Sequence, residues 1–169
     1  FSRRLYKYIG VHRDIPAPDV GTNSKIMDWM TAAQKQIGKT HDNGMFTGKS
    51  VNFGGSKGRG EATAAGIVHC INQWVKHQEE NGNRLPIITY IIQGFGNVGN
   101  NLSLELFNRD DAKIIAVGEY NGYLFNKQGI DINKLYKFFK KNNHINNPKL
   151  GKFINKPSEV LELDCDILI

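Results

Sequence analysis

The stretch that decides the fold is "IIQGFGNVGNN", residues 91–101. It places Gly94, Gly96 and Gly99 in the spacing G-x-G-x-x-G, between an apolar run and a more polar one. This spacing is short enough to occur by chance, so its meaning depends on the segments on either side of it.

Those segments have the pattern of alternating strands and helices. An apolar, β-branched run at 87–93 precedes the glycines and predicts a parallel strand that is buried on both faces. Apolar residues at helical spacing follow over 97–109, and a second apolar run over 112–119 ends in Glu119, 20 residues after Gly99. A strand, a glycine turn, a helix and a second strand with an acidic end form the context of a dinucleotide-binding motif.

Each residue type in this motif has a physical role. Gly94 permits the tight turn, Gly96 lets a pyrophosphate approach the backbone, and Gly99 lets the helix pack close to the strand. The helix N-terminus offers free N–H groups and a partial positive charge to the phosphates. Glu119 is expected to accept hydrogen bonds from the adenosine ribose and to repel a 2′-phosphate. NAD is therefore predicted over NADP, although nearby lysines could compensate for this repulsion, so NADP stays possible. The alternative to a cofactor site is a strand–turn–helix that binds no ligand.

The remaining elements predict an α/β fold. Helices are expected over 25–37, 61–79 and 131–141, and a further strand, interpreted as buried, over 164–169. Residues 121–131 are rich in turn formers. This order indicates a Rossmann-like parallel sheet with helices on both faces.

Two further features concern the first 60 residues. The helix at 25–37 carries an apolar stripe that includes Met27 and Trp29, which we interpret as core. Glycines gather between residues 38 and 60, and this segment is the best candidate for an interdomain hinge.

Composition excludes several classes of function. The net charge is +6, but the lysines of residues 134–156 alternate with asparagine and aromatic residues and are typical of a solvated helix and loop. No apolar run approaches the roughly 20 residues that span a bilayer. The two cysteines lie far apart and the five histidines are scattered, which argues for a reducing compartment and against a metal site. We therefore expect no metal, no nucleic acid and no membrane partner.

The ends of the sequence also carry an expectation. The chain starts without Met, shows no signal peptide, and stops inside a predicted strand. We therefore expect a fragment of a longer protein.

Further motifs occur in a fixed order along the chain. They are "DIPAPDVGTN" (14–23), "TGKSVNFGGSKGR" (47–59), "EATAAG" (61–66), "QGFGNVG" (93–99), "AVGEYNGYLFNKQGID" (116–131) and "CDILI" (165–169). Together they closely resemble glutamate dehydrogenase, within the glutamate, leucine, phenylalanine and valine dehydrogenase family, over nearly the whole chain.

The resemblance implies reversible, NAD(P)-dependent oxidative deamination of L-glutamate to 2-oxoglutarate and ammonia by a homo-hexamer. It implies that residues 1–47 end an α/β domain for substrate binding and assembly. Residues 48–60 then form the hinge, and residues 61–169 form part of a Rossmann domain.

The resemblance also implies roles for single residues. Asp19 matches a catalytic aspartate that relays protons, although from its surroundings alone it reads as a turn or cap residue. Arg59 matches a residue that binds the substrate carboxylate and lies near the cofactor, while Thr63 and Asn97 match the pair that holds the nicotinamide carboxamide. The cofactor-binding set is Arg59, Thr63, Gly94, Phe95, Gly96, Asn97, Val98, Gly99 and Glu119.

Several alternatives stay open at this level. Leucine, valine or phenylalanine dehydrogenase and a non-catalytic nucleotide-binding paralogue are the competing functions. The family's catalytic lysines would lie upstream of Phe1, so the 169-residue chain is expected to be inactive alone. Tyr120 stands where many relatives have a small residue, and this difference is expected to alter the ribose pocket. The compartment, mitochondrial matrix or cytoplasm, is undecided.

Overall fold

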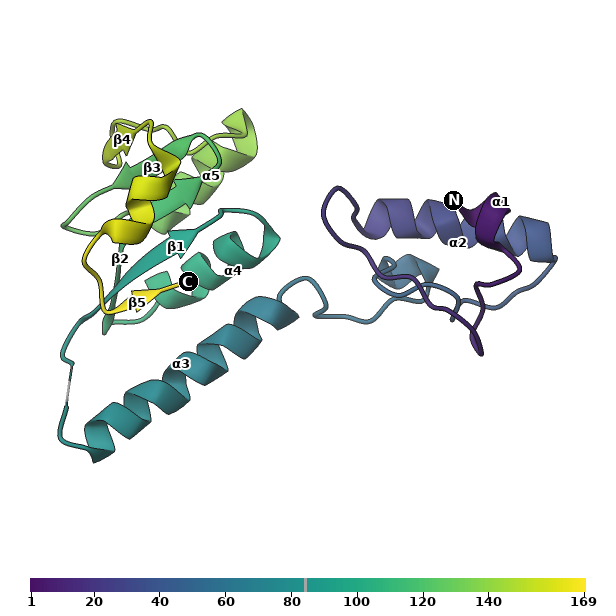
Figure 1. Cartoon of the computed structure of the whole chain (residues 1–169), viewed down its shortest axis with the longest axis horizontal. Helices are drawn as coiled ribbons and strands as arrows, with labels where there is room; N and C mark the ends of the chain where they lie inside the picture. The colour runs from purple at the N-terminus through teal and green to yellow at the C-terminus, as the bar shows by residue number, and fades with distance from the viewer. Residues whose placement is uncertain (84) are drawn as a thin grey trace. The chain divides into compact units, whose positions relative to one another are not determined.

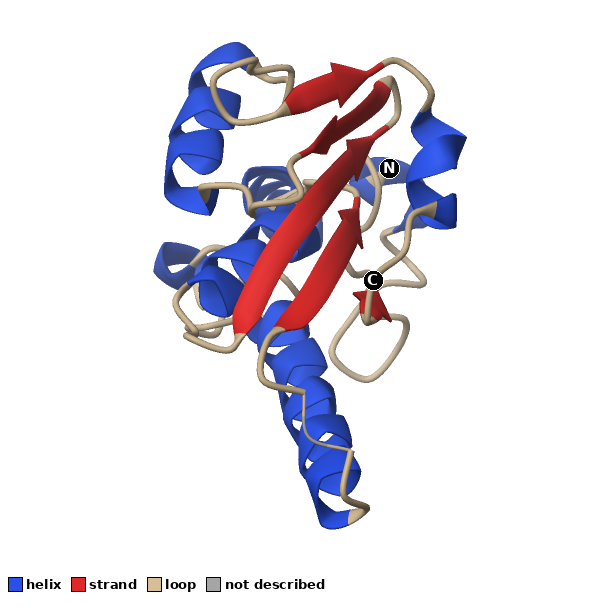
Figure 2. Ribbon diagram, turned by 90° about the vertical axis from the view of Figure 1, so that its left-hand side faces the viewer, coloured by secondary structure: helices blue, strands red, loops and turns tan. Residues whose placement is uncertain are grey.

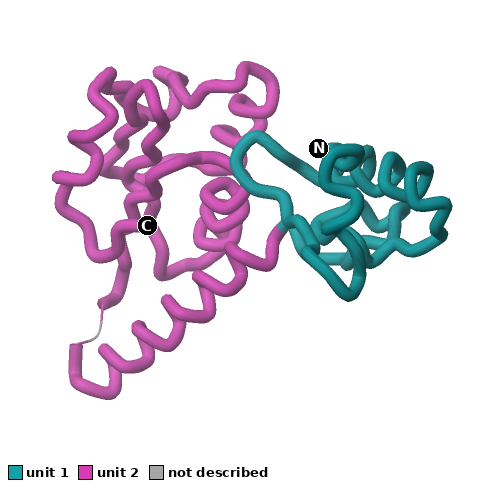
Figure 3. Tube along the Cα trace, turned by 45° about the vertical axis from the view of Figure 1, so that its right-hand side comes forward, with its two compact units in different colours: residues 1–60 teal, residues 61–169 magenta. Residues whose placement is uncertain are grey.

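The computed structural model describes residues 1–83 and 85–169. The chain divides into two compact units, residues 1–60 and residues 61–169 (Figure 3). The boundary follows Gly60, at the end of the glycine-rich segment.

Unit 1 contains helices α1 (Ser2–Leu5), α2 (Ser24–Gly38) and the short 3-10 helix η1 (Val51–Phe53) (Figure 1). The side chain of Asn23 caps α2 by accepting a hydrogen bond from the Ile26 N–H at 3.2 Å. The small core of the unit consists of Ile9, Met27, Met45 and Phe46.

The prediction that Trp29 belongs to the core is wrong. Met27 is buried, but Trp29 is 60% exposed, and the Lys25 Nζ lies 5.3 Å from the centre of its ring. Residues two positions apart on an α-helix point in nearly opposite directions, because each residue turns the helix by about 100°. Burial of Met27 therefore turns Trp29 towards solvent.

Unit 2 is built around a five-stranded sheet (Figure 2). The strands are β1 (Ile88–Gln93), β2 (Ala112–Glu119), β3 (Gly122–Phe125), β4 (Lys152–Ile154) and β5 (Ile167–Leu168), in the spatial order β4-β3-β2-β1-β5. β1 pairs in parallel with β2 and β5, whereas β3 pairs antiparallel with β2 and β4. The predicted Rossmann-like α/β fold is confirmed, with an antiparallel edge added to its parallel centre.

Helices α3 (Ala62–Glu80), α4 (Asn97–Phe107) and α5 (Ile132–Asn142) contribute to one large core with the sheet. Side chains alternate along β1, so Tyr90 and Ile92 join this core while Ile91 faces the other side. There Ile91 packs in a second cluster with Val160 of the 3-10 helix η2 (Pro157–Glu162).

Two details differ from the sequence-based expectation. Part of the turn-rich segment forms strand β3, because this part pairs with β2 across a two-residue turn. Leu124 of β3 is fully buried. The last strand exists as β5 but is not buried, and Leu168 is 47% exposed. In the described part of the chain, β5 lies at the sheet edge and pairs only with β1, which explains this exposure.

Candidate functional site

The glycine loop joins the carboxyl end of β1 to the start of α4. Gly94 has a φ of +90°, a conformation that favours glycine, and this turns the chain sharply after Gln93. The Gly94 N–H donates a hydrogen bond to the Gly118 carbonyl at 2.8 Å, so the turn begins beside the end of β2. Gly96 is the N-cap residue of α4 and leaves the first turn of the helix without a capping side chain.

The other two glycines of the motif have opposite surroundings. A Cβ atom placed on Gly99 would lie 1.8 Å from the Gly94 carbonyl oxygen, which is impossible without movement of the backbone. A Cβ atom placed on Gly96 would meet no described atom within 4 Å, apart from its chain neighbours. Gly99 is thus required for packing of α4, whereas Gly96 faces the open space in which a pyrophosphate would lie. These residues fit a dinucleotide.

Glu119 fixes the loop from the neighbouring strand. Its Oε1 accepts a hydrogen bond from the Phe95 N–H at 2.6 Å, and the Glu119 side chain is only partly buried. Phe95 is fully buried and packs edge-on against Phe139 of α5, with ring centres 5.3 Å apart. The structure therefore brings the loop and the acidic end of β2 together, and a carboxylate has a second oxygen with which to bind a ribose.

The remaining predicted residues of unit 2 lie on helices. Asn97 is the exposed first residue of α4, and its carbonyl accepts a hydrogen bond from the Asn101 side chain at 2.9 Å. Val98 follows it and is half-buried. Thr63 is exposed in the first turn of α3.

Unit 1 contains a pocket of about 390 Å³. It is lined by Ile15, Asn43, Gly44, Phe46, Thr47, Gly48, Lys49, Gly54, Gly55, Ser56 and Arg59. These residues include two cations and no carboxylate, a composition that favours an anion over a cation.

Of the polar residues that line this pocket, Arg59 was predicted as a substrate- and cofactor-binding residue, whereas Lys49 and Thr47 were not predicted as site residues. Lys49 is only 9% exposed, and its Nζ donates a hydrogen bond to the Phe46 carbonyl. Within residues 1–83 and 85–169, neither Lys49 nor Arg59 forms an ion pair. All three residues stand in the motif "TGKSVNFGGSKGR", which was the available signal.

Asp19, the predicted catalytic residue, lies in an exposed turn of unit 1. Its Oδ1 accepts the Val20 N–H at 2.8 Å, and its backbone carbonyl accepts the Thr22 N–H at 2.9 Å. This is the turn geometry expected from its local sequence. Asp19 is not among the residues that line the pocket.

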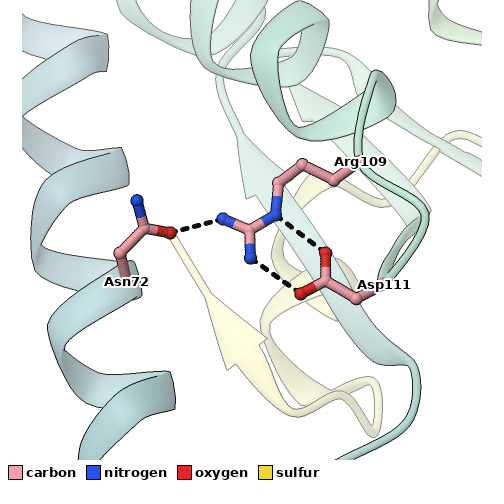
Figure 4. A network of polar contacts seen from close by, with 3 residues as sticks. All are labelled: Asn72, Arg109 and Asp111. Atoms are coloured by element: carbon pink, nitrogen blue, oxygen red, sulfur yellow. Dashed lines mark hydrogen bonds and ion pairs between the residues drawn. The ribbon is translucent and has the colours of Figure 1, made fainter.

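A polar network ties α3 to the start of β2 (Figure 4). Arg109 donates two hydrogen bonds to Asp111, at 2.8 and 2.7 Å, and a third to the side chain of Asn72. The guanidinium lowers the pKa of the Asp111 carboxyl below its ordinary value, and this hydrogen bonding raises the pKa of Arg109. The network lies at the start of β2, at the opposite end of the strand from Glu119, and links α3 to the sheet.

The described residues contain no group of three or more His, Cys, Asp or Glu side chains that is arranged to hold a metal ion. None of the helices in residues 1–83 and 85–169 is long and apolar enough to cross a membrane.

Comparison with known families gives a direct assignment. The profile of the glutamate/leucine/phenylalanine/valine dehydrogenases matches residues 54–169, which is more than half of the chain. The chain belongs to this dehydrogenase family. A second profile, of the dimerisation domain of the same dehydrogenases, matches residues 1–36.

Curated relatives in this dehydrogenase family match the whole chain. The catabolic NAD-specific glutamate dehydrogenase RocG of Bacillus subtilis is 38% identical over all 169 residues, and the chain covers 38% of that protein. An NAD-specific glutamate dehydrogenase of Staphylococcus aureus is 37% identical, with 39% of its length covered. The chain thus spans less than half the length of these relatives.

Solved structures support the same fold. The glutamate dehydrogenase of Peptoniphilus asaccharolyticus is 36% identical, with a TM-score of 0.61 over 84% of this chain and 36% of that chain. A hetero-hexameric glutamate dehydrogenase from Thermus thermophilus has a TM-score of 0.85 over 99% of this chain and 38% of its own, at 24% identity.

Proposed function

We propose that the chain forms part of an NAD-dependent glutamate dehydrogenase, which interconverts L-glutamate with 2-oxoglutarate and ammonia. The observation that carries this proposal is the loop Gly94–Gly99, in which Gly96 borders open space and Glu119 holds the Phe95 N–H. Relatives that match the whole chain are NAD-specific glutamate dehydrogenases, which supports the choice of substrate and cofactor.

On the cofactor side, the first N–H groups of α4 would bind the pyrophosphate, because the helix N-terminus combines free donors with a partial positive charge. Glu119 would accept hydrogen bonds from the adenosine ribose and repel a 2′-phosphate, so NAD is preferred over NADP. Thr63 and Asn97 would orient the nicotinamide carboxamide. When bound, NAD supplies the hydride acceptor for the α-carbon of the amino acid.

On the substrate side, the pocket of unit 1 would hold a carboxylate. Arg59 offers a planar pair of donors that matches a carboxylate, and Lys49 adds a second, largely desolvated positive charge. Thr47 contributes a hydroxyl to the same lining. Two cations suit an acidic amino acid better than a branched-chain or aromatic one.

Asp19 is proposed to move protons as the imine forms and is hydrolysed. Residues 1–47 would belong to the substrate and assembly domain, residues 48–60 to the hinge, and residues 61–169 to the cofactor domain. Assembly as a homo-hexamer is part of the same proposal, as is the expectation that residues 1–169 alone have no useful activity.

Substitution of Asp19 with Asn, in the active protein that carries this chain, tests the proposal. Loss of a general acid–base group should lower kcat by about 10²–10⁴-fold and leave the Kd for NAD within about twofold, since Asp19 is not in the cofactor loop. Steady-state kinetics and titration calorimetry measure the two effects. Asp110→Asn, an exposed aspartate of unit 2, is the matched control.

The outcomes separate the parts of the proposal. Unchanged kcat in Asp19→Asn would remove Asp19 from the mechanism. A wild-type protein that binds no NAD would reject the dehydrogenase function itself. A substrate panel that shows faster turnover of leucine, valine or phenylalanine than of glutamate would transfer the function to another branch of the family.

A further inference from the structure

Tyr120 lies beside the proposed cofactor site but has no role in the function proposed above. It is 85% exposed, more than any other described aromatic residue, and it directly follows Glu119 at the carboxyl end of β2. Tyr120 and Asn121 form the two-residue turn between β2 and β3, because Glu119 pairs with Gly122 across the hairpin. Burial of a large aromatic side chain is energetically favourable, so an exposed tyrosine at the carboxyl end of β2 is a candidate contact surface for a ligand.

The backbone of this turn is fixed although the tyrosine ring is exposed. Gly122 has a φ of +145°, and a Cβ atom there would lie 2.3 Å from the Ile154 carbonyl oxygen, so the hairpin is tightly packed against β4. On the other side, Glu119 is held to the glycine loop through the Phe95 N–H at 2.6 Å. The backbone that carries Tyr120 is therefore fixed between the glycine loop and β4.

The chemistry of an adenosine matches this pair of neighbours. Its ribose and its base are joined by a single bond, and consecutive Cα atoms are about 3.8 Å apart. A residue next to a carboxylate that binds the ribose is therefore within reach of the base. An aromatic ring can stack on the π-face of a purine. Removing such a contact weakens binding by about 5- to 150-fold.

We propose that Tyr120 stacks on the adenine of the bound dinucleotide and forms one wall of its base pocket. This inference rests on the proposed NAD function and extends it to the end of the cofactor that takes no part in the chemistry. The role of Tyr120 is affinity, and the discrimination against a 2′-phosphate belongs to Glu119.

The test compares ligands with and without the base. Titration calorimetry on the protein that carries this chain measures the Kd of NAD, AMP and nicotinamide mononucleotide for Tyr120→Ala, Tyr120→Phe and the wild type. Tyr8→Ala is the matched control, because Tyr8 is 64% exposed and lies in unit 1. Thermal unfolding of each variant accompanies the titrations.

We expect Tyr120→Ala to raise the Kd values of NAD and AMP by about tenfold and to leave the Kd of nicotinamide mononucleotide within twofold of the wild-type value. Tyr120→Phe should retain the wild-type affinities within about twofold, since the ring is kept. Equal Kd values for NAD in Tyr120→Ala and the wild type overturn the inference and leave the proposed function intact. An equal loss for AMP and nicotinamide mononucleotide also overturns it, because the loss would then not depend on the base.

Discussion

Two segments of the chain are rich in glycine, and they use it for different purposes. Residues 94–99 join a buried strand to a helix, and Phe95 between the glycines is fully buried. Residues 44–60 belong to unit 1, where the described residues include no strand, and they line a pocket instead.

The difference is visible in what a side chain would meet. In the first segment, Gly99 is pressed against the backbone of Gly94 while Gly96 borders open space. In the second, a Cβ atom on Gly55 would lie 1.9 Å from the Lys49 carbonyl oxygen, so glycine there closes a loop on itself. A glycine count therefore does not identify a ligand site; the surroundings of each glycine do.

The largest effect is expected for Gly99→Ala. The added methyl group collides with the Gly94 carbonyl, so α4 must move away from β1 at a cost of about 3 kcal/mol in the free energy of unfolding. Urea denaturation measures this loss. A loss below about 0.5 kcal/mol would show that the contact between α4 and the loop is looser than described.

A somewhat smaller loss is expected for Gly55→Ala, about 2 kcal/mol, because only the loop around Lys49 must rearrange. Hydrogen exchange by mass spectrometry locates the effect. Faster exchange in α2 and in residues 44–60, with unchanged exchange in β1, is the expected pattern. Equal acceleration in β1 would contradict a local role for this glycine.

The smallest change in stability is expected for Gly96→Ala, about 1 kcal/mol, because no described atom lies within 4 Å of an added Cβ but alanine is a poorer N-cap residue than glycine. The Kd for NAD should nevertheless rise at least about tenfold, since the methyl group occupies the approach of the pyrophosphate. Calorimetry with NAD and urea denaturation separate the two effects. Unchanged affinity would break the contrast between Gly96 and Gly99.

The sequence predicted the centre of unit 2 well because the relevant patterns are local. The run that forms β2 was predicted with its observed bounds, Ala112–Glu119, and α4 begins at Asn97 as expected. Strand β3 was missed because its pairing depends on a turn and on a neighbouring strand. Burial of β5 was overestimated because apolar composition does not report whether a strand lies at an edge.

The candidate site likewise contains features that the sequence indicated and features that it did not. The hydrogen bond from the Phe95 N–H to Glu119 joins residues 24 positions apart; the motif spacing predicted that the loop and Glu119 belong to one site, but not this bond. Lys49 was missed because neither its burial nor the lack of a carboxylate in its pocket can be read from neighbouring residues. Such features depend on how distant segments fold over one another.

The Arg109–Asp111 pair has a consequence for acid tolerance. A carboxyl group whose pKa is lowered in the native state stabilises the fold above its unfolded pKa, and this contribution declines as the pH falls from the unfolded value through the lowered one. The brace between α3 and β2 therefore stays charged at the mildly acidic pH at which ordinary aspartates begin to take up protons. Mild acid should therefore protonate aspartates with ordinary pKa values before it breaks the Arg109–Asp111 pair beside this helix.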